Sequence, residues 1–205
     1  ERQAWFSVVG FQLTGLKISP LRWLSWPNFW EINLRTYVRD RYGKKGIWFY
    51  SLDSSDPLAV TGARMLYGLP YNCARTEGRI NSNKISFLSR RNFPHPKADA
   101  QFEATFQSSR KKLYADSELD HFLLERYRFW SRRKISHTSF SAEVKHKPYQ
   151  AVLTDHAKYK GALFSSQGFP EPVDGPSRGH YCEGFSVQAS APSWAFSIAG
   201  QANQR

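Results

Sequence analysis

Three neighbouring segments decide the expected fold: NLRTYV at residues 33–38, GIWFYSLD at residues 46–53 and ARMLYGLPY at residues 63–71. They are rich in aromatic and β-branched residues, which favour strands. Residues 47–52 form a nearly continuous apolar run, typical of a strand buried on both faces. Arg35 and Arg64 interrupt these runs, and a buried arginine must be paired or must face a polar cavity. The segment therefore predicts a barrel or cone of strands around a charged interior.

Length and composition indicate one domain with a well-buried core. The chain has 205 residues, of which 40% are hydrophobic and 16% aromatic. No apolar run reaches the length of a membrane-spanning helix, so a membrane protein is not expected. Cys73 and Cys182 lie in no metal-binding spacing and are too few for a disulfide framework. Two free thiols are typical of a reducing compartment, which predicts a cytoplasmic protein.

Period-two patterns predict most of the remaining structure. A strand is expected at residues 5–11, a hairpin at residues 75–91 around Asn81–Asn83, and a half-exposed strand at residues 100–106, where apolar and polar residues alternate. Residues 93–96 and 165–179 predict loops, residues 185–189 a last strand, and residues 191–205 a polar tail.

Helix signals are few. One principal helix is predicted at about 117–130, capped by Asp116 or Ser117, because Ser117 and Asp120 approximate a capping box. A shorter helix is predicted at residues 57–66. The expected fold class is α+β and mainly antiparallel β.

The net charge of +12 is concentrated in the middle of the chain. Residues 61–147 hold 17 Lys and Arg against 8 Asp and Glu. This region is either a nucleic-acid-binding face or a set of solvated loops around Arg110–Lys112 and Arg132–Lys134. No zinc-finger, helix-turn-helix or RNA-binding signature accompanies the charge, so the sequence favours loops and disfavours nucleic acid as a partner.

The sequence resembles the uncharacterised bacterial YqjF-like family. The resemblance is carried by NxRTYV, SLD, ARxxYxLPY, FLxERY and VxHxP, found here at residues 33–38, 51–53, 63–71, 122–127 and 144–148. It extends over about residues 5–190 and implies a single domain at 1–190, with the tail at 191–205 outside it. Tyr149 stands where family members tend to have Trp, and the family's usual N-terminal segment is not found in this sequence.

That family is similar in turn to acetoacetate decarboxylase, which implies a cone of antiparallel strands with a buried reaction centre. The decarboxylase motif GRExxxFPKK supplies a lysine that forms a Schiff base, next to a second lysine. Here Arg64 matches the arginine, Met65 replaces the glutamate, and Tyr71 and Asn72 occupy the lysine positions. Neither residue offers the unprotonated amine that a Schiff base needs. The resemblance implies the scaffold and its cavity, without the decarboxylase chemistry.

Arg35, Arg64, Asn72 and Asp53 are the predicted substrate-binding residues. A guanidinium gives a two-pronged fit to a carboxylate or enolate. Alternatively, Arg35 and Arg64 are neutralised inside the protein by Asp53, Glu31 or Glu125 and only hold strands together. The sequence alone does not decide between these roles.

Glu125, Tyr71 and His146 are the predicted catalytic residues. Glu125 is either a general base in the cavity or a surface partner of Arg126 or Arg128. Tyr71 is either a proton donor at the nucleophile position or a packed aromatic residue. His146 is either a proton shuttle or a partly exposed histidine between two lysines. The six histidines show no HxxxH or HxH spacing, so neither a metal nor a cofactor is predicted.

Together these patterns predict a protein that binds a small anionic or carbonyl-bearing organic molecule in an internal cavity. It is either a lyase or hydratase that works without a Schiff base or a non-catalytic binding protein. The rival hypothesis is a binding protein whose basic surface contacts nucleic acid or an acidic partner. Self-association into a homo-oligomer stays open.

Overall fold

A computed structural model describes residues 3–17, 26–92, 99–106, 113–133 and 136–195. The strands are β1 (Phe6–Leu13), β2 (Phe29–Arg39), β3 (Lys45–Ser54), β4 (Tyr71–Asn81), β5 (Lys84–Arg91), β6 (Asp99–Phe106), β7 (Arg128–Arg132), β8 (Ser139–Lys145), β9 (Val152–Gly161), β10 (His180–Tyr181), β11 (Gln188–Ala189) and β12 (Ser193–Ala195). The helices are α1 (Pro57–Tyr67), α2 (Glu118–Leu124) and the short 3-10 turn η1 (Ser165–Gln167). The α+β, mainly antiparallel class is confirmed.

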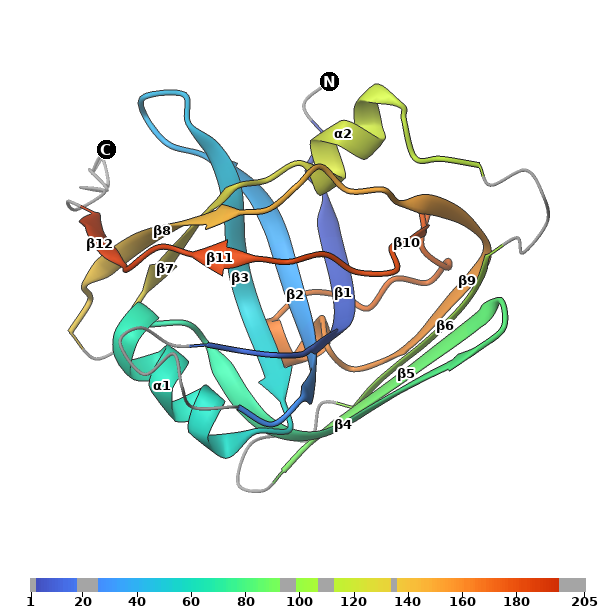
Figure 1. Ribbon diagram of the computed structural model, residues 1–205, viewed down its shortest axis with the longest axis horizontal. Coiled ribbons are helices and arrows are strands. Elements are labelled where there is room, and N and C mark those ends of the chain that lie inside the picture. The colour runs from blue at the N-terminus through green and yellow to red at the C-terminus, as the bar shows by residue number, and fades with distance from the viewer. Residues whose placement is uncertain (1–2, 18–25, 93–98, 107–112, 134–135, 196–205) are drawn as a thin grey trace.

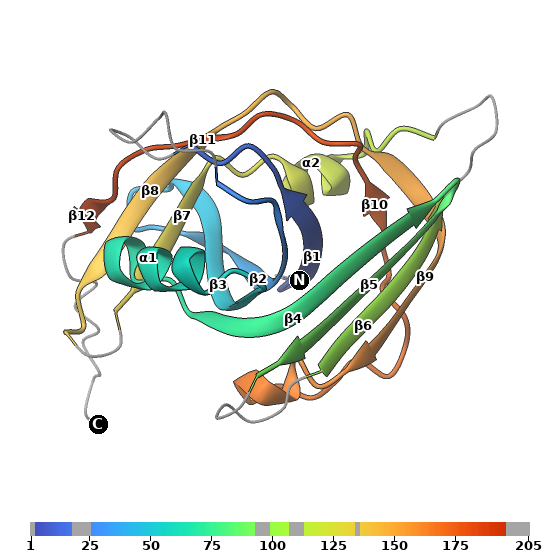
Figure 2. The same cartoon turned by 60° about the horizontal axis from the view of Figure 1, so that its bottom comes forward.

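The described strands form one mixed sheet in the order β10-β9-β6-β5-β4-β3-β7-β8-β11, with β2 on β3, β1 on β2 and β12 on β8. The sheet curves but does not close into a barrel. Figure 2 shows β4, β5, β6 and β9 as one curved layer, with β1, β2 and β3 lying within the curve. Short α2 lies above β1, whereas α1 lies beside β7 and β8 (Figure 1).

Strand β3 is the branch point of the sheet. Its one edge pairs with β2 over most of its length. Its other edge pairs in parallel with β7 at Ile47 and Trp48 and with β4 from Leu52 onward. A bulge in β3 opposite Leu34 and Arg35 adds one residue, Tyr50, which has no register partner on β2.

Each face of the β2–β3 ribbon packs into its own core. One core contains Ile32, Leu34, Phe87, Ala100 and Leu163, between the ribbon and the β4–β9 layer. The other contains Ile47, Leu52, Leu69, Phe129 and Ala142, beneath α1. Both faces of the ribbon are therefore buried, as the apolar run at residues 47–52 predicts.

The predicted hairpin, capping box and strands at residues 5–11 and 100–106 are confirmed, but other boundaries differ. The strand predicted at residues 185–189 is limited to Gln188–Ala189, and β12 follows it. The loop predicted at residues 165–179 begins with the 3-10 turn η1. Ser117 caps α2 with the predicted reciprocal bonds to Asp120. The helix ends at Leu124 rather than near residue 130, because Arg128–Arg132 pair with β8 instead. Part of the predicted tail is ordered, since Ser193–Ala195 pair with Ser139–Ser141. The predicted loop at 93–96 lies outside the described residues.

Candidate functional site

Glu31 and Tyr71 form a buried acid pair at the start of β2 and β4. The Tyr71 hydroxyl donates a hydrogen bond of 2.7 Å to Glu31 Oε2. Glu31 is 3% exposed. The two strands bring these residues together because both flank β3, where Glu31 lies opposite Ser54 and Tyr71 opposite Leu52. Side chains two positions apart share one face of a strand, so the pair faces one side.

The surroundings of Glu31 change its acidity. Burial raises the pKa of Glu31 to about 7, although hydrogen bonds from Tyr71 and Asn33 oppose this shift. Burial, together with the neighbouring Glu31, also raises the pKa of Tyr71 well above its usual value. Near neutral pH, Glu31 can therefore either hold or release a proton while Tyr71 keeps its own.

Asn33 and Arg35 extend this pair along β2. Residues 31, 33 and 35 of one strand point to the same face. Asn33 Oδ1 and Arg35 Nε are both buried and have no hydrogen-bond partner within the part of the chain that the structure describes. Arg35 also makes a long 3.5 Å contact from Nη2 to the Leu123 carbonyl oxygen. Glu31, Asn33, Arg35 and Tyr71 are called the interior row below.

A second buried carboxylate lies on the opposite face of the ribbon. Asp53 is fully buried and accepts hydrogen bonds from Arg91 Nε at 2.8 Å and Asn72 Nδ2 at 3.1 Å. Ser89 Oγ lies 3.3 Å from its other oxygen. Burial raises the pKa of Asp53, whereas the charge and hydrogen bond of Arg91 lower it. The predicted pair of Asp53 and Asn72 is thus brought together, around a guanidinium.

Glu125 and His146 lie in a third cluster, joined by aromatic side chains. The Glu125 carboxylate accepts hydrogen bonds from the Tyr127 hydroxyl and from the Tyr149 backbone N–H, the latter at 3.0 Å. The His146 ring lies 4.7 Å from the Tyr127 ring and 4.8 Å from the Tyr149 ring. The alternative role of Glu125, an ion pair with Arg126 or Arg128, is not seen among the described residues: Arg128 pairs with Glu143, and Arg126 donates to the Glu125 backbone carbonyl.

This cluster adjoins the interior row through Tyr149. Burial raises the pKa of Tyr149, while the nearby Arg35 charge lowers it. Arg35 therefore belongs to the interior row and also acts electrostatically on Tyr149 of the Glu125 cluster. Of the seven predicted site residues, Tyr71 and Arg35 belong to the row, Asp53 and Asn72 to the opposite face, and Glu125 and His146 to the third cluster.

The expectation that Arg64 is internal is wrong. Arg64 is exposed on α1, and its Nε donates a 2.8 Å hydrogen bond to the Tyr71 backbone carbonyl. Val60, one turn earlier on the same helix face, is buried, whereas Arg64 lies near the exposed end of α1 and its guanidinium reaches the first residue of β4. Within the described residues, Arg64 forms no ion pair with Asp53, Glu31 or Glu125, whose carboxylates bind other side chains or backbone groups. The buried arginine is instead Arg91, which is 5% exposed.

The sequence patterns did not lead to Arg91, and they suggested Glu31 only as a carboxylate that could neutralise an arginine. The signal for Arg91 is its phase: Phe87, Ser89 and Arg91 alternate with more exposed neighbours and are all buried. Glu31 shows the same signal, since it lies between Trp30 and Ile32 in phase with Phe29. A charged residue that keeps the phase of buried neighbours indicates a functional or paired group.

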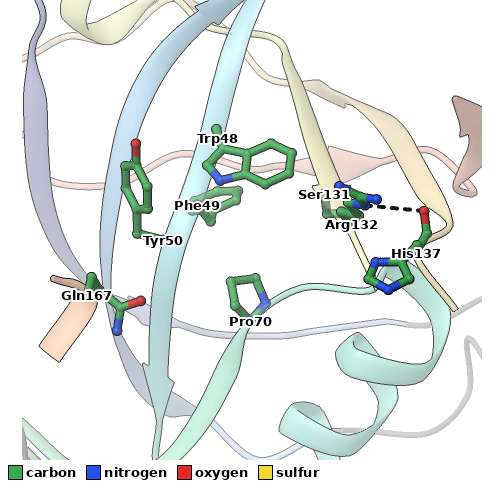
Figure 3. A pocket seen from close by; sticks show the side chains of 8 residues that line it. All are labelled: Trp48, Phe49, Tyr50, Pro70, Ser131, Arg132, His137 and Gln167. Atoms are coloured by element: carbon green, nitrogen blue, oxygen red, sulfur yellow. Dashed lines mark hydrogen bonds between the residues drawn. The ribbon is translucent and has the colours of Figure 1, made fainter. Parts of the chain in front are cut away.

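Two pockets open near these clusters. The larger, of about 470 Å³, lies beside the fork of β3 and is lined by Trp48, Phe49, Tyr50, Pro70, Ser131, Arg132, His137 and Gln167 (Figure 3). The smaller, of about 380 Å³, is lined by residues around Cys182 and Phe185 next to the Glu125 cluster. None of the four residues of the interior row is among the described residues that line these two pockets.

Neither a metal-binding cluster nor a membrane-spanning helix is found in the described ranges. No three His, Cys, Asp or Glu side chains in those ranges gather closely enough to hold a metal ion. No described helix has the length and apolar character needed to cross a membrane. Cys73 and Cys182 are free thiols.

The basic triplets are only partly described. Arg133 donates to the Met65 carbonyl and lies over the Phe140 ring, and Arg132 Nε donates to the His137 carbonyl at 3.3 Å. These contacts hold the end of β7 in place. Arg110–Lys112 and Lys134 lie outside the described residues.

Comparison with known proteins identifies the family. Residues 1–186 match the model of the DUF2071 family, described as "Uncharacterized conserved protein (COG2071)". The chain belongs to this family. It is also 36% identical over 151 residues to "Uncharacterized protein YqjF" of Bacillus subtilis (strain 168), an alignment that covers 72% of this chain and 59% of that protein. The chain thus spans less than two thirds of the length of that relative.

The structural comparison confirms the expected scaffold. The fold is similar to acetoacetate decarboxylase from Legionella pneumophila subsp. pneumophila, with a TM-score of 0.56 and 12% identity, covering 83% of this chain and 67% of that one. At this identity the likeness concerns the fold alone. The DUF2071 sequence family and the acetoacetate-decarboxylase-like fold are therefore established together.

Proposed function

We propose that this protein binds a small anionic or carbonyl-bearing organic molecule along the interior row, where Glu31 and Tyr71 transfer a proton to or from it. The reaction class is that of a lyase or hydratase which activates a carbonyl compound without a covalent lysine adduct. The observation that carries the proposal is the 2.7 Å contact between the Tyr71 hydroxyl and a Glu31 carboxyl whose pKa is about 7.

An acid with this pKa suits proton transfer at neutral pH. General acid–base catalysis works best when the pKa of the group lies close to the working pH. As a carboxylate, Glu31 removes a proton from the carbon next to a carbonyl group, and the electron pair moves onto the carbonyl oxygen. Once Glu31 carries that proton, the Tyr71 hydroxyl, which stays protonated, turns from Glu31 and donates its one hydrogen bond to the negatively charged oxygen.

The far end of the row supplies an anchor for the ligand's charge. Arg35 Nε and Asn33 Oδ1 are buried polar atoms without partners in the described chain, and such atoms call for an occupant. The Cα atoms of Glu31 and Arg35 are separated by roughly 13 Å, at about 3.3 Å per strand residue. A small keto acid or hydroxy acid, with its carboxylate at Arg35 and its carbonyl at Tyr71, matches this order of groups.

The resemblance to acetoacetate decarboxylase supports the place of this site. Tyr71 lies where that enzyme is expected to have its Schiff-base lysine, and it faces the same side as Glu31. Asn72, at the second lysine position, faces the opposite side and bonds Asp53. The scaffold therefore keeps a titratable pair at the reactive position while the amine is replaced.

Deuterium exchange tests the proposal directly. The protein is incubated in D2O near pH 7 with pyruvate, acetoacetate and 2-oxobutyrate, and loss of the C–H signals next to the carbonyl is followed by proton NMR. We expect catalysed exchange with at least one of them, lost in Glu31→Gln and reduced in Tyr71→Phe. Arg35→Gln should raise KM more than it lowers kcat, because it removes uniform binding. Borohydride should trap no lysine adduct.

The controls separate the three clusters. Glu125→Gln and His146→Gln test the third cluster, where Glu125 and His146 remain predicted catalytic groups. Exchange that survives Glu31→Gln but is lost in Glu125→Gln would move the reaction there. Binding without exchange for every compound would favour a non-catalytic binding protein, and a borohydride-stable mass shift on a lysine would contradict the proposal.

A further inference from the structure

The larger pocket lies at the fork of the sheet, away from the interior row. Between its pairing with β7 at Trp48 and its pairing with β4 at Leu52, one edge of β3 has no register partner in the described strands. The pocket of about 470 Å³ opens at this place. Trp48 lies opposite Thr36, so it faces the side of the ribbon opposite Glu31 and Arg35.

The pocket combines a flat apolar floor with polar walls. Trp48, Tyr50 and Pro70 contribute rings, and Figure 3 shows Pro70 between Gln167 on one side and His137 on the other. The volume falls within the range of about 300–1,000 Å³ that small-molecule sites occupy. Rings favour a flat ligand, since stacking on aromatic faces needs a planar partner.

The charge of the walls favours an anion. Arg132 is exposed and lines the pocket, and its Nε bonds the His137 carbonyl at 3.3 Å, which orients the guanidinium. No Asp or Glu is among the pocket's lining residues. The anionic group is expected at Arg132, because a guanidinium binds a carboxylate through two parallel hydrogen bonds.

The backbone at His137 has a strained, left-handed conformation, which further supports a ligand site in this pocket. His137 has a φ of +54°. Among the described residues other than glycine, Ser82 in the β4–β5 hairpin turn also has a positive φ. Strained residues cluster at ligand sites, where the surrounding structure holds them. Here the strained peptide presents the carbonyl that fixes Arg132.

The opposite wall is held by a chain of hydrogen bonds. Gln167 Nε2 donates to Ser166 Oγ at 3.1 Å, and Arg91 Nη1 donates to the same oxygen at 3.1 Å. Arg91 is in turn fixed by Asp53. The Gln167 amide is therefore positioned from the buried core, and its position on the wall facing Arg132 suits the polar end of a ligand.

We propose that this fork pocket is a binding site for a small planar aromatic carboxylate. Its carboxylate pairs with Arg132, its ring stacks over Trp48 and Pro70, and a hydroxyl or amino group at the far end of the ring meets Gln167. The site is distinct from the proposed reaction on the interior row, because none of Glu31, Asn33, Arg35 and Tyr71 is among the described residues that line this pocket.

Ligand-observed NMR titrations with four probes test this site. The probes are 4-hydroxybenzoate, benzoate, cyclohexanecarboxylate and the uncharged benzyl alcohol. We expect 4-hydroxybenzoate to bind most tightly and benzyl alcohol most weakly. Arg132→Gln should weaken both aromatic carboxylates by about tenfold, equal to about 1.4 kcal/mol, and leave benzyl alcohol unchanged. Gln167→Leu should remove the advantage of 4-hydroxybenzoate over benzoate.

Matched variants keep the result interpretable. Arg75→Gln removes an equally exposed arginine on β4 and should change no affinity; Trp48→Leu should weaken only the aromatic probes. Thermal melts confirm that each variant is folded. No saturable binding of any aromatic carboxylate to the parent protein would overturn the proposal, as would equal losses in Arg132→Gln and Arg75→Gln. Glu31→Gln should leave these affinities intact, so failure here is distinguishable from failure of the proposed reaction.

Discussion

Glu31 and Asp53 are two buried carboxylates on neighbouring strands, and their surroundings differ in one decisive respect. Asp53 faces the β4–β9 layer and receives the Arg91 guanidinium. Glu31 faces the other core and receives the neutral Tyr71 hydroxyl and Asn33 amide. Burial raises the pKa of both groups, but at Asp53 the arginine opposes that effect.

This difference distinguishes a carboxylate that stabilises the fold, Asp53, from one whose surroundings suit proton transfer, Glu31. A buried ion pair is satisfied by its partner and ties strands together. Asp53 joins β3 to β5 through Arg91 and to β4 through Asn72. A buried carboxyl with neutral donors keeps a proton that can leave near pH 7. The two faces of one ribbon thus hold an ion-paired carboxylate on one side and a carboxyl hydrogen-bonded by neutral groups on the other.

Removing Arg91 should give the largest effect. Arg91→Ala leaves Asp53 buried without its cation, and we expect unfolding free energy to fall by about 3–5 kcal/mol in urea denaturation. Asp53→Asn added to this variant should restore part of the loss, because no buried charge is left unpaired. Arg90→Ala is the control: Arg90 is 64% exposed in its side chain and pairs with Asp99, so the cost should be about 0–1 kcal/mol. Equal costs for the two arginines would contradict the assignment of Asp53 as the structural carboxylate.

Local patterns predicted the strands well because each signal lies within a few residues. The alternation at Asp99–Phe106 and the turn at Ser82 are written into adjacent residues, and both elements form as expected. Helix α2 shows the limit of such signals. Its start was predictable from the capping box, but its end depends on β8, whose pairing with Arg128–Arg132 replaces the last turns.

The site was harder to predict because it depends on register between distant strands. Glu31 and Tyr71 are 40 residues apart and meet through the parallel pairing of β3 with β4, which no local pattern specifies. Arg64 and Arg91 show the same limit. Arg64 follows Ala63 yet is exposed near the end of a helix, whereas Arg91 follows the exposed Arg90 yet lies at the buried end of a strand.

The pH dependence of stability should single out Glu31. Its folded pKa of about 7 lies above the ordinary value of 4.5, so the folded state binds the proton more tightly than the unfolded chain does. The contribution of this group to stability is fully present below about pH 4.5 and is lost as the pH rises to about 7. The total loss should be about 3 kcal/mol, since one pKa unit corresponds to about 1.4 kcal/mol.

Urea denaturation at intervals between pH 4.5 and 8 measures this loss. Subtracting the curve of Glu31→Gln from that of the parent protein isolates the group, and Glu103→Gln, which removes an exposed carboxylate on β6, should leave the slope intact. Tyr71→Phe should move the midpoint to higher pH, because the Tyr71 hydrogen bond lowers the pKa of Glu31. Parallel curves for the parent and Glu31→Gln would show that Glu31 is not the proton-holding carboxyl.

The smallest effect on stability is expected from replacing Arg64, whose side chain bonds the backbone of Tyr71, the hydrogen-bond partner of Glu31. It is exposed and donates to the Tyr71 backbone carbonyl, where a hydrogen bond contributes about 1 kcal/mol net. Arg64→Ala should therefore cost about 1 kcal/mol in urea denaturation, several times less than Arg91→Ala, and should leave the pH midpoint of Glu31 in place. Arg75→Ala on the exposed face of β4 is the matched control. A loss at Arg64 as large as that at Arg91 would mean that Arg64 neutralises a buried acid, and Glu31 would then be an ion-paired carboxylate like Asp53 rather than its counterpart.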